Sequence, residues 1–308
     1  MGVPSIAVYN RYFLPGTRFT RVAEIFERCG VQRRLKLGPG ETAGSIATEA
    51  AERALTMAGM PAGNLNLIIC ATTLPENLGY GLSSTVQRNL GARQSATFDL
   101  RAACTGFVKA LEVAVSLIET GAYSNVLLIG VETPSLMYDD APEVAMLFGD
   151  GAGAVVLTRS EKLQPWVFTM DDDGTQSNLI SRPLFGDTRV VFNGLRVFEV
   201  AVRTMTHNSQ IVLAKAEIGL KDIQRFCPHQ ANIRIIRAVA KALGLTDRIG
   251  RLNRKVIVNI NSYGNTSSAS IPIALTGAVE RGRLNKGDLI LLTAAGAGVT
   301  SGAAILEW

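Results

Sequence analysis

The sequence predicts an α/β protein made of two similar halves, in which helices cover mostly parallel, buried sheets. Short apolar runs rich in β-branched residues alternate with longer segments of helical periodicity, and this alternation is typical of βαβ units. Each half also closes with a glycine-rich turn, GDGAGAVVL in the first and AAGAGVTSGAAILEW in the second. We therefore expect a tandem duplication, with halves at residues 1–160 and 161–308 and a divide near Arg159–Gln164.

The apolar periodicity places strands and helices in alternation along the chain. The strand candidates are Leu65–Cys70, Ser95–Leu100, Val126–Val131, Ala152–Leu157, Val256–Ile260 and Leu289–Leu292. The helix candidates are Ala43–Gly59, Ser83–Leu90, Cys104–Thr120, Leu195–Ala216, Asn232–Leu243 and Ser267–Arg281. The segment Asp171–Thr188 is rich in Asp, Gly, Ser and Pro, and we expect it to form an excursion or lid loop.

The composition is that of a globular protein with a substantial core. Of the 308 residues, 47% are hydrophobic and 19% are charged, which excludes a mostly disordered chain. No apolar run reaches the roughly 18–20 residues that a membrane span needs. The N-terminal MGVPSIAVYNRYFLPG lacks the basic region followed by an apolar region of a signal peptide. We therefore expect no membrane association and a cytoplasmic location.

Cysteine and histidine spacing argues against a metal site. None of the four cysteines forms a C-x-x-C pair, and the two histidines lie far from them in sequence. The spacing also does not fit a secreted disulfide framework. The net charge of +5 suits an acidic partner or substrate, while the absence of aromatic–basic interleaving disfavours nucleic acid. The residues concerned are Cys29, Cys70, Cys104, Cys227, His207 and His229.

Cys104 is the first candidate for chemistry. In FDLRAACTGFVKALEVAVSLIETG, a strand ends at Leu100 and Cys104 stands where a long amphipathic helix begins. The helix N-terminus and its unpaired backbone N–H groups favour a thiolate at such a position. Thr105 and Gly106 leave the sulfur with little steric cover. The alternative is an inert buried cysteine, which is how we interpret Cys70.

Two further polar residues follow strand-like segments at helix starts. His229 comes after Pro228 in RFCPHQANIRIIRAVAKALG, and Asn265 lies in NINSYGNTSSASIPIAL. Taken separately, His229 is more often a structural histidine and Asn265 a turn residue, and His207 in a helical stretch fits the structural interpretation. Strand-to-helix junctions, however, converge at the carboxyl edge of a doubly wound sheet, where ligands bind. Together with Cys104, the two residues therefore predict one site.

The order Cys…His…Asn, carried by AACTGF, PHQAN and YGNTSSASIP, closely resembles the β-ketoacyl-acyl carrier protein synthase III family. FGDGAGAVVL, FNGLRVFEVAV and the terminal GAGVTSGAAILEW are also similar to that family, so the resemblance runs from about Glu41 to Trp308. It implies a duplicated, thiolase-like fold of five layers, αβαβα. It also implies the initiating condensation of type II fatty acid synthesis, and a homodimer with strands paired across the interface.

The resemblance implies a reaction in two stages. Cys104 attacks an acyl thioester and takes the acyl group, after which a malonyl thioester loses CO2 and its carbanion attacks the acyl-cysteine. His229 and Asn265 would donate hydrogen bonds to the enolate oxygen, and the backbone N–H groups of Cys104 and Gly298 would form the oxyanion hole of acyl transfer. The substrates would be thioesters of coenzyme A or acyl carrier protein, and no cofactor or metal is expected.

The chain departs from the family pattern around the substrate entrance. EIFERCGVQRR lacks the tryptophan that family members carry there, and Pro142 replaces an arginine that helps to hold the adenine of coenzyme A. Arg33 or Arg34 could still meet phosphates. Gly79 stands where the family often has a bulky gate residue, which predicts an acyl pocket larger than acetyl needs, although Tyr80 could refill it.

Arg234 falls at the position that docks the acidic acyl carrier protein in the family. Arg237 and Lys241 follow at helical spacing on the same face, and a solvated basic face is an equal alternative for these two.

Three other functions are alternatives to this condensation. The first is a specialised family member, serving pimelate supply for biotin, quinolone or polyketide priming, or acyl transfer to an alcohol. The second, a hydroxymethylglutaryl-coenzyme A synthase relative, lacks its acid near Ala71–Thr73. The third, a binding module without chemistry, is disfavoured by the intact triad.

Overall fold

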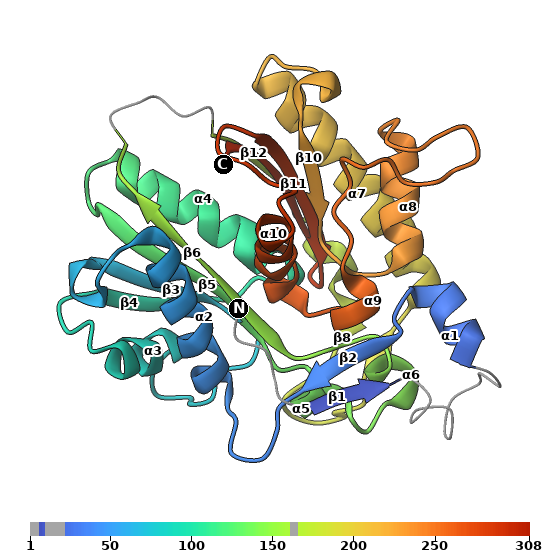
Figure 1. The fold of residues 1–308 in the computed structure, drawn as a ribbon. Helices are drawn as coiled ribbons and strands as arrows, with labels where there is room; N and C mark the ends of the chain where they lie inside the picture. The colour runs from blue at the N-terminus through green and yellow to red at the C-terminus, as the bar shows by residue number, and fades with distance from the viewer. Residues whose placement is uncertain (1–5, 10–21, 161–165) are drawn as a thin grey trace.

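The computed structural model describes residues 6–9, 22–160 and 166–308 (Figure 1). Two sheets lie face to face with a pair of helices between them, and further helices cover the outer face of each sheet (Figure 1). This is the five-layered αβαβα arrangement that the family resemblance predicts. Among the described residues, no helix combines the length and apolar character needed to cross a membrane, and the cytoplasmic location stays a prediction.

The first sheet has the strand order β4-β3-β5-β6. Its strands are β3 (Leu67–Ala71), β4 (Ala96–Leu100), β5 (Asn125–Glu132) and β6 (Gly151–Thr158). β3 pairs in parallel with both β4 and β5, whereas β6 runs antiparallel to β5. Since β3 is fully buried and lies between two parallel neighbours, an uninterrupted apolar LIICA is the expected sequence for it.

The second sheet also has four strands, in the order β10-β11-β12-β7. Its strands are β7 (Val167–Met170), β10 (Arg225–Pro228), β11 (Leu289–Gly296) and β12 (Thr300–Glu307). β10 and β11 are parallel, and β12 runs antiparallel to β11 and to β7. Both sheets are therefore mixed: the first is mostly parallel as expected, whereas the expectation was wrong for the second, in which β11, β12 and β7 pair antiparallel. The boundary at 160/161 stays a prediction, and Glu161–Gln164 lie outside the described residues.

The helices of the middle layer connect the two halves. α4 (Gly106–Glu119) and α10 (Ser270–Glu280) lie between the sheets. Their apolar side chains share one buried cluster with strands of both sheets, including Phe107 at 1% and Ile271 at 1% exposure. The outer layers are α2 (Ala43–Ala58) with α3 (Leu82–Leu90) and α7 (Gly194–Lys215) with α8 (Ile233–Ala242). Burial of α4 on both sides fixes where its N-terminal end, and hence Cys104, lies.

Shorter elements surround this core. The helices among them are α1 (Val22–Cys29), α5 (Ser135–Tyr138), α6 (Pro142–Ala145) and α9 (Ile260–Tyr263). Two small antiparallel pairs are β1 (Ile6–Tyr9) with β2 (Arg33–Lys36) and β8 (Ile180–Ser181) with β9 (Val191–Phe192). The expected loop Asp171–Thr188 contains a 3₁₀ segment, Gly174–Leu179, and the short β8.

One expected strand was wrong, and several strands were missed, among them β7 and β12. Val256–Ile260 makes a single parallel bridge, from Val256 to Phe226 of β10, and the chain then turns into α9. Asparagines at 259 and 261 interrupt the apolar run there and end the pairing. Conversely, β12 lies in the C-terminal stretch that its glycines suggested was a turn, because only residues 297–299 form the turn between β11 and β12.

Candidate active site

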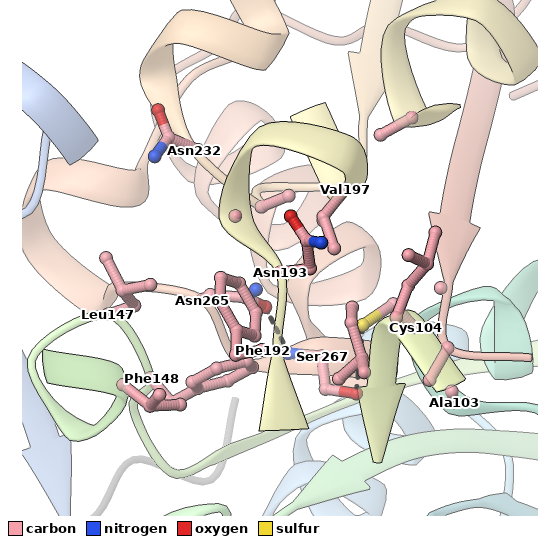
Figure 2. Close-up of a pocket in the computed structure, with 18 of the residues that line it drawn as sticks. Ala103, Cys104, Leu147, Phe148, Phe192, Asn193, Val197, Asn232, Asn265 and Ser267 are labelled. Atoms are coloured by element: carbon pink, nitrogen blue, oxygen red, sulfur yellow. Dashed lines mark hydrogen bonds between the residues drawn. The ribbon is translucent and has the colours of Figure 1, made fainter. Parts of the chain in front are cut away.

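A cavity of about 1460 Å³ lies where the two halves meet, and it brings the three predicted catalytic residues together. Cys104, His229 and Asn265 all line it. Figure 2 shows the Cys104 sulfur next to Ser267, with Asn265 on the other side of Ser267. The three residues are supplied by the segments after β4, after β10 and after α9. The three residues therefore line one cavity as expected, although Asn265 follows a short helix and not the expected strand.

Cys104 is held in a short 3₁₀ turn between β4 and α4. Ala103, directly before it, has a left-handed backbone with φ of +47°, which is costly for a residue with a Cβ. The following Thr105 is completely buried, and its hydroxyl lies 2.6 Å from the Ala102 carbonyl and 2.9 Å from Thr300 Oγ1. Cys104 is half-buried and open to the cavity, whereas the other three cysteines are buried.

The surroundings of Cys104 favour the neutral thiol. Burial, opposed by a hydrogen bond from Ser267 and reinforced by the negative charge of Glu132, raises the pKa of Cys104 to about 12. The sequence predicted the opposite direction from the helix N-terminus alone. In the folded protein, desolvation outweighs that contribution, so the thiol must lose a proton before it can attack a substrate.

His229 is positioned from both sides. Its backbone N–H donates to the Thr293 carbonyl at 2.8 Å, and its Nδ1 lies 2.6 Å from Ser270 Oγ. Nε2 has no hydrogen-bond partner among the described residues. Burial lowers the pKa of His229 to about 3, so the imidazole is neutral at physiological pH. Such a ring can offer one N–H group to a ligand but holds an extra proton poorly.

Asn265 presents its amide in a defined orientation. Its backbone N–H donates to Leu147 and its carbonyl accepts from Gly149, which fixes the residue against the chain before β6. The side-chain Oδ1 accepts the backbone N–H of Ser267 at 2.8 Å (Figure 2). Because the oxygen is used in this way, Nδ2 is the group left to donate to a molecule in the cavity.

The turn between β11 and β12 passes very close to the nucleophile. A Cβ added to Gly296 would lie 2.8 Å from the backbone nitrogen of Cys104 and 3.2 Å from its Cβ. Only glycine permits this approach. Gly298, the predicted oxyanion-hole residue, lies in the same turn and lines the cavity with Cys104. Its role in binding an oxyanion stays a prediction.

Family models and known proteins match the chain over most of its length. The model of the 3-oxoacyl-[acyl-carrier-protein] synthase III family matches residues 98–174, and that of its C-terminal part matches residues 213–308. The β-ketoacyl-[acyl-carrier-protein] synthase III 2 of Vibrio vulnificus strain YJ016 is 44% identical over 278 residues, which are 85% of this chain and 75% of that protein. The chain belongs to this family.

Solved structures agree with that assignment. The crystal structure of 3-oxoacyl-[acyl-carrier-protein] synthase III from Aquifex aeolicus VF5 is similar with a TM-score of 0.92 at 38% identity, covering 99% of this chain and 97% of that one. The priming β-ketosynthase from the R1128 polyketide biosynthetic pathway has a TM-score of 0.88 at 30% identity, covering 99% and 93%. The predicted family and its thiolase-like fold are thereby confirmed.

Glu132 and Ser267 are site residues that were not predicted from the sequence. Glu132 ends β5 and lines the cavity at 2% exposure. It accepts hydrogen bonds from the backbone and hydroxyl of Thr73 and from Ser267. Burial raises its pKa to about 7, against the lowering effect of these bonds. An acid at the carboxyl end of a buried strand, in VLLIGVETPS, was the available signal.

The arginines of the site are only partly those expected. Arg234 is exposed in the first turn of α8 and lines the cavity, as a docking residue would. Arg34 is completely buried and cannot meet phosphates, and Arg33 is exposed but is not among the cavity-lining residues. Exposed Arg28 of α1 and exposed Arg189 line the cavity instead, and sequence reasoning did not single them out.

Gly79 and Tyr80 do not line the cavity within one chain. They lie on the surface between β3 and α3, where Tyr80 is 51% exposed. Their predicted part in the acyl pocket therefore stays a prediction. His207 is exposed in α7, outside the cavity. In the part of the chain that the structure describes, no group of three or more His, Cys, Asp or Glu residues could hold a metal ion.

Proposed function

We propose that the protein catalyses a decarboxylative Claisen condensation between an acyl thioester and a malonyl thioester, through an acyl-cysteine on Cys104. The observation that carries this proposal is the convergence of one accessible thiol with two neutral N–H donors, from His229 and Asn265, in one cavity. Acyl carrier protein is a proposed carrier in keeping with the name of the family, and coenzyme A is proposed as the second carrier.

In the acylation step the Cys104 sulfur attacks the thioester carbonyl, the tetrahedral intermediate collapses, and the first carrier leaves as a thiol. The negative charge on the carbonyl oxygen needs donors that are already in place. Backbone N–H groups of Cys104 and Gly298 are proposed for this role because the close turn at Gly296 brings the two segments together. One such donor lowers the barrier by about 3–4 kcal/mol.

In the condensation step the malonyl group loses CO2 and leaves an enolate, whose carbon attacks the acyl-cysteine and expels the Cys104 thiolate. The enolate oxygen is stabilised by donors that need not be charged. The Ser270 hydroxyl accepts the N–H of Gln230 at 3.3 Å and is thus oriented to donate to Nδ1 of His229. That arrangement leaves Nε2–H of His229 without a partner among the described residues, and we propose that it donates to the enolate oxygen together with Nδ2 of Asn265, which lines the same cavity.

The entrance favours an acidic, extended carrier. Arg28, Arg189 and Arg234 are exposed and line the cavity. Arg189 is paired with Asp187 at 2.6 Å, so the proposed docking contact falls on Arg234. α8 continues the basic surface through exposed Arg237 and Lys241. Positive groups at the rim mainly accelerate and orient the approach of an acidic partner.

We also propose a homodimer that pairs through β4. This strand is an edge of its sheet, and its Phe98 is 37% exposed. Unpaired backbone groups and apolar side chains on an edge are a template for pairing with a second strand. Leu78 and Tyr80, exposed at 95% and 51%, lie in the loop before α3. The backbone N–H of Leu82, at the start of α3, donates to the Asp99 carboxylate of β4, so this loop lies next to the edge strand.

Gly79 and Tyr80 do not line the cavity of their own chain, so their predicted pocket role requires that they reach the cavity of the second copy. A Phe98→Asp variant that sediments like the wild type would argue against this interface.

The test of the proposed reaction follows mass and CO2 together. The wild type is incubated with acyl thioesters of coenzyme A, and the mass of the intact protein should increase by one acyl group. Cys104→Ala should show no increase. Addition of malonyl carrier protein should then release CO2 and return the free enzyme. Failure of every thioester to acylate Cys104 would overturn the proposal.

A specialised priming enzyme is the second candidate function. It is favoured by the size of the cavity and by small residues beside the nucleophile, since Ala295, Gly296 and Val299 all line it. A structurally similar relative is a priming ketosynthase. A panel of thioesters from acetyl upward distinguishes the two. Faster acylation by acetyl than by longer or dicarboxylic groups favours primary fatty acid synthesis, and the reverse order favours the specialised role.

A further inference from the structure

A hydrogen-bonded chain leads from the nucleophile to a buried carboxylate. Ser267 Oγ lies 3.5 Å from Cys104 Sγ and 3.1 Å from Glu132 Oε1. Ser267 itself has a left-handed backbone with φ of +48°, held by the bond from its N–H to Asn265. A hydroxyl can donate one hydrogen bond while it accepts another. The geometry therefore allows the S–H group to donate to Ser267 while Ser267 donates to Glu132.

Cys104 needs a proton acceptor, and His229 is poorly suited to be one. The thiol is neutral at rest because its pKa is raised to about 12. Nδ1 of His229 is already engaged with Ser270, and burial lowers the pKa of the ring to about 3. A group that loses its proton so readily would hold the thiol proton only briefly at neutral pH. The acceptor should be a group in the cavity that titrates nearer neutrality.

We propose that Glu132 accepts the proton of Cys104 through the hydroxyl of Ser267, and so generates the attacking thiolate. The S–H bond of Cys104 breaks as its proton passes to Ser267 Oγ, and the proton already on Ser267 Oγ passes to Glu132 Oε1. The products are a thiolate, an unchanged serine hydroxyl and a carboxylic acid. This inference deepens the proposed acyl transfer and rests on it. Glu132 acts on Cys104 through the hydroxyl of Ser267.

The surroundings of Glu132 are consistent with this role. Burial raises its pKa to about 7, and hydrogen bonds from Thr73 and Ser267 keep the pKa from rising further. The other titratable groups whose charges interact with it are Cys104 and Tyr138 of α5, both of which have a pKa raised to about 12. His229, which lines the same cavity, has its pKa lowered to about 3. Of these four groups, Glu132 is the one whose pKa lies near neutrality.

The proton balance closes over acyl transfer. When the carrier leaves Cys104 it departs as a thiolate and takes up one proton to become a thiol. Loss of the proton from Glu132 restores the carboxylate at the same time, so the enzyme neither gains nor loses a proton overall. The carboxylate is then ready for the next acylation.

If Glu132 had only an electrostatic or structural role, its replacement would give the opposite result. In that case its carboxylate only raises the pKa of Cys104 by repulsion and connects the Thr73 loop to Ser267. Replacing it with a neutral amide would then lower the pKa of the thiol and accelerate its reactions. If Glu132 is the proton acceptor, the same replacement slows them.

The experiment is alkylation of Cys104 by iodoacetamide, followed by intact mass from about pH 5 to 9. This reaction requires no acyl thioester, so its result stands even if the proposed condensation fails. The other three cysteines are buried, and Cys104→Ala gives the background. We expect the wild-type rate to rise as Glu132 ionises through about pH 7. Glu132→Gln and Ser267→Ala should both lose this rise and react at least about tenfold more slowly at pH 8.

Asp150→Asn is the matched control, because Asp150 is another buried carboxylate that hydrogen-bonds to Leu37 and Ser135 rather than to the thiol. Its alkylation rate should rise with pH at the same midpoint as that of the wild type. Thermal melting checks that each variant is folded. Alkylation of Glu132→Gln at the wild-type rate or faster would overturn the proposal. So would a retained rise near pH 7 in Ser267→Ala, since the path through the hydroxyl would then be unnecessary.

Discussion

Ser270 Oγ lies 2.6 Å from Nδ1 of His229 and determines which ring nitrogen can serve the cavity. The serine stands in the first turn of α10, and the histidine follows β10. One helix of the middle layer thus orients a side chain that the second sheet supplies. Because Nδ1 is engaged, the proposed donor to the enolate is Nε2–H, and its presence depends on the serine hydroxyl.

Ser270→Ala should therefore impair condensation more than acylation. Loss of the hydroxyl leaves Nδ1 of His229 without its partner, so the ring proton is no longer held on Nε2. An unpaired polar group at a buried site costs about 1–3 kcal/mol. Because about 1.4 kcal/mol corresponds to a factor of ten, we expect CO2 release from malonyl carrier protein to fall by roughly 10- to 100-fold. Acylation of Cys104, followed by intact mass, should stay within about twofold of the wild type.

Ser209→Ala is the control for this variant. Ser209 is also buried in a helix and donates to a backbone carbonyl, that of Met205, but it is not among the cavity-lining residues. It should keep both half-reactions. Equal losses of acylation and condensation in Ser270→Ala would contradict a role of the hydroxyl through His229.

Gly296→Ala should abolish acylation. The added Cβ would meet the Cys104 backbone nitrogen at 2.8 Å, a contact that folded proteins essentially never show, so either the turn or the nucleophile must move. Displacement of catalytic groups by about 1 Å reduces rates on the order of 100-fold. The acylation rate with acetyl-coenzyme A measures the effect. Gly63→Ala, where a Cβ would meet nothing within 4 Å, should be neutral, and an active Gly296→Ala would show that the turn adapts freely.

Much of the site could be predicted because its chemistry is local in the sequence. Cys104 and His229 each follow a strand and Asn265 follows the short α9, all three precede a helix, and the fold brings these segments to one cavity. The direction of the Cys104 pKa shift could not be predicted in this way. It depends on how deeply the folded cavity buries the sulfur and on a carboxylate from another strand.

Other features depended on long-range contacts that no local pattern shows. The link from Glu132 to Cys104 passes through Ser267, which is 135 residues away from the acid in sequence. The apolar triplet Val256–Val258 has the composition of a strand, but it pairs at one position only because the chain turns into α9. The family resemblance predicted a pocket role for Gly79 and Tyr80, but the two residues are not among those that line the cavity of a single chain.

The stability of the protein should show two opposing pH dependences between pH 4.5 and 6.5. The His229 pKa falls from 6.5 to about 3 on folding, so the unfolded chain binds the extra proton and stability decreases as pH falls below 6.5. The Glu132 pKa rises from 4.5 to about 7, so the folded protein keeps a proton longer and stability decreases as pH rises above 4.5. Each contribution changes by at most about 1.4 kcal/mol per pH unit.

Single variants separate the two contributions. Relative to the wild type, Glu132→Gln should gain stability as pH rises from 4.5 to 7, and His229→Gln should gain stability as pH falls from 6.5. Urea unfolding of the three proteins at several pH values within this window measures the differences. Parallel stability curves for wild type and variants would show that neither group titrates differently in the folded and unfolded protein.

Arg234→Glu should weaken the use of a protein carrier more than the use of coenzyme A. Arg234 is exposed beside the cavity entrance on α8, and reversing its charge replaces attraction of an acidic carrier with repulsion. We expect KM for malonyl carrier protein to rise about tenfold at low salt, and its salt dependence to decrease. Arg281→Glu, a reversal at an exposed site after α10 that is not among the cavity-lining residues, is the matched control. Equal KM values for the two variants would remove Arg234 from the docking surface and leave only the general positive charge of the protein to attract the carrier.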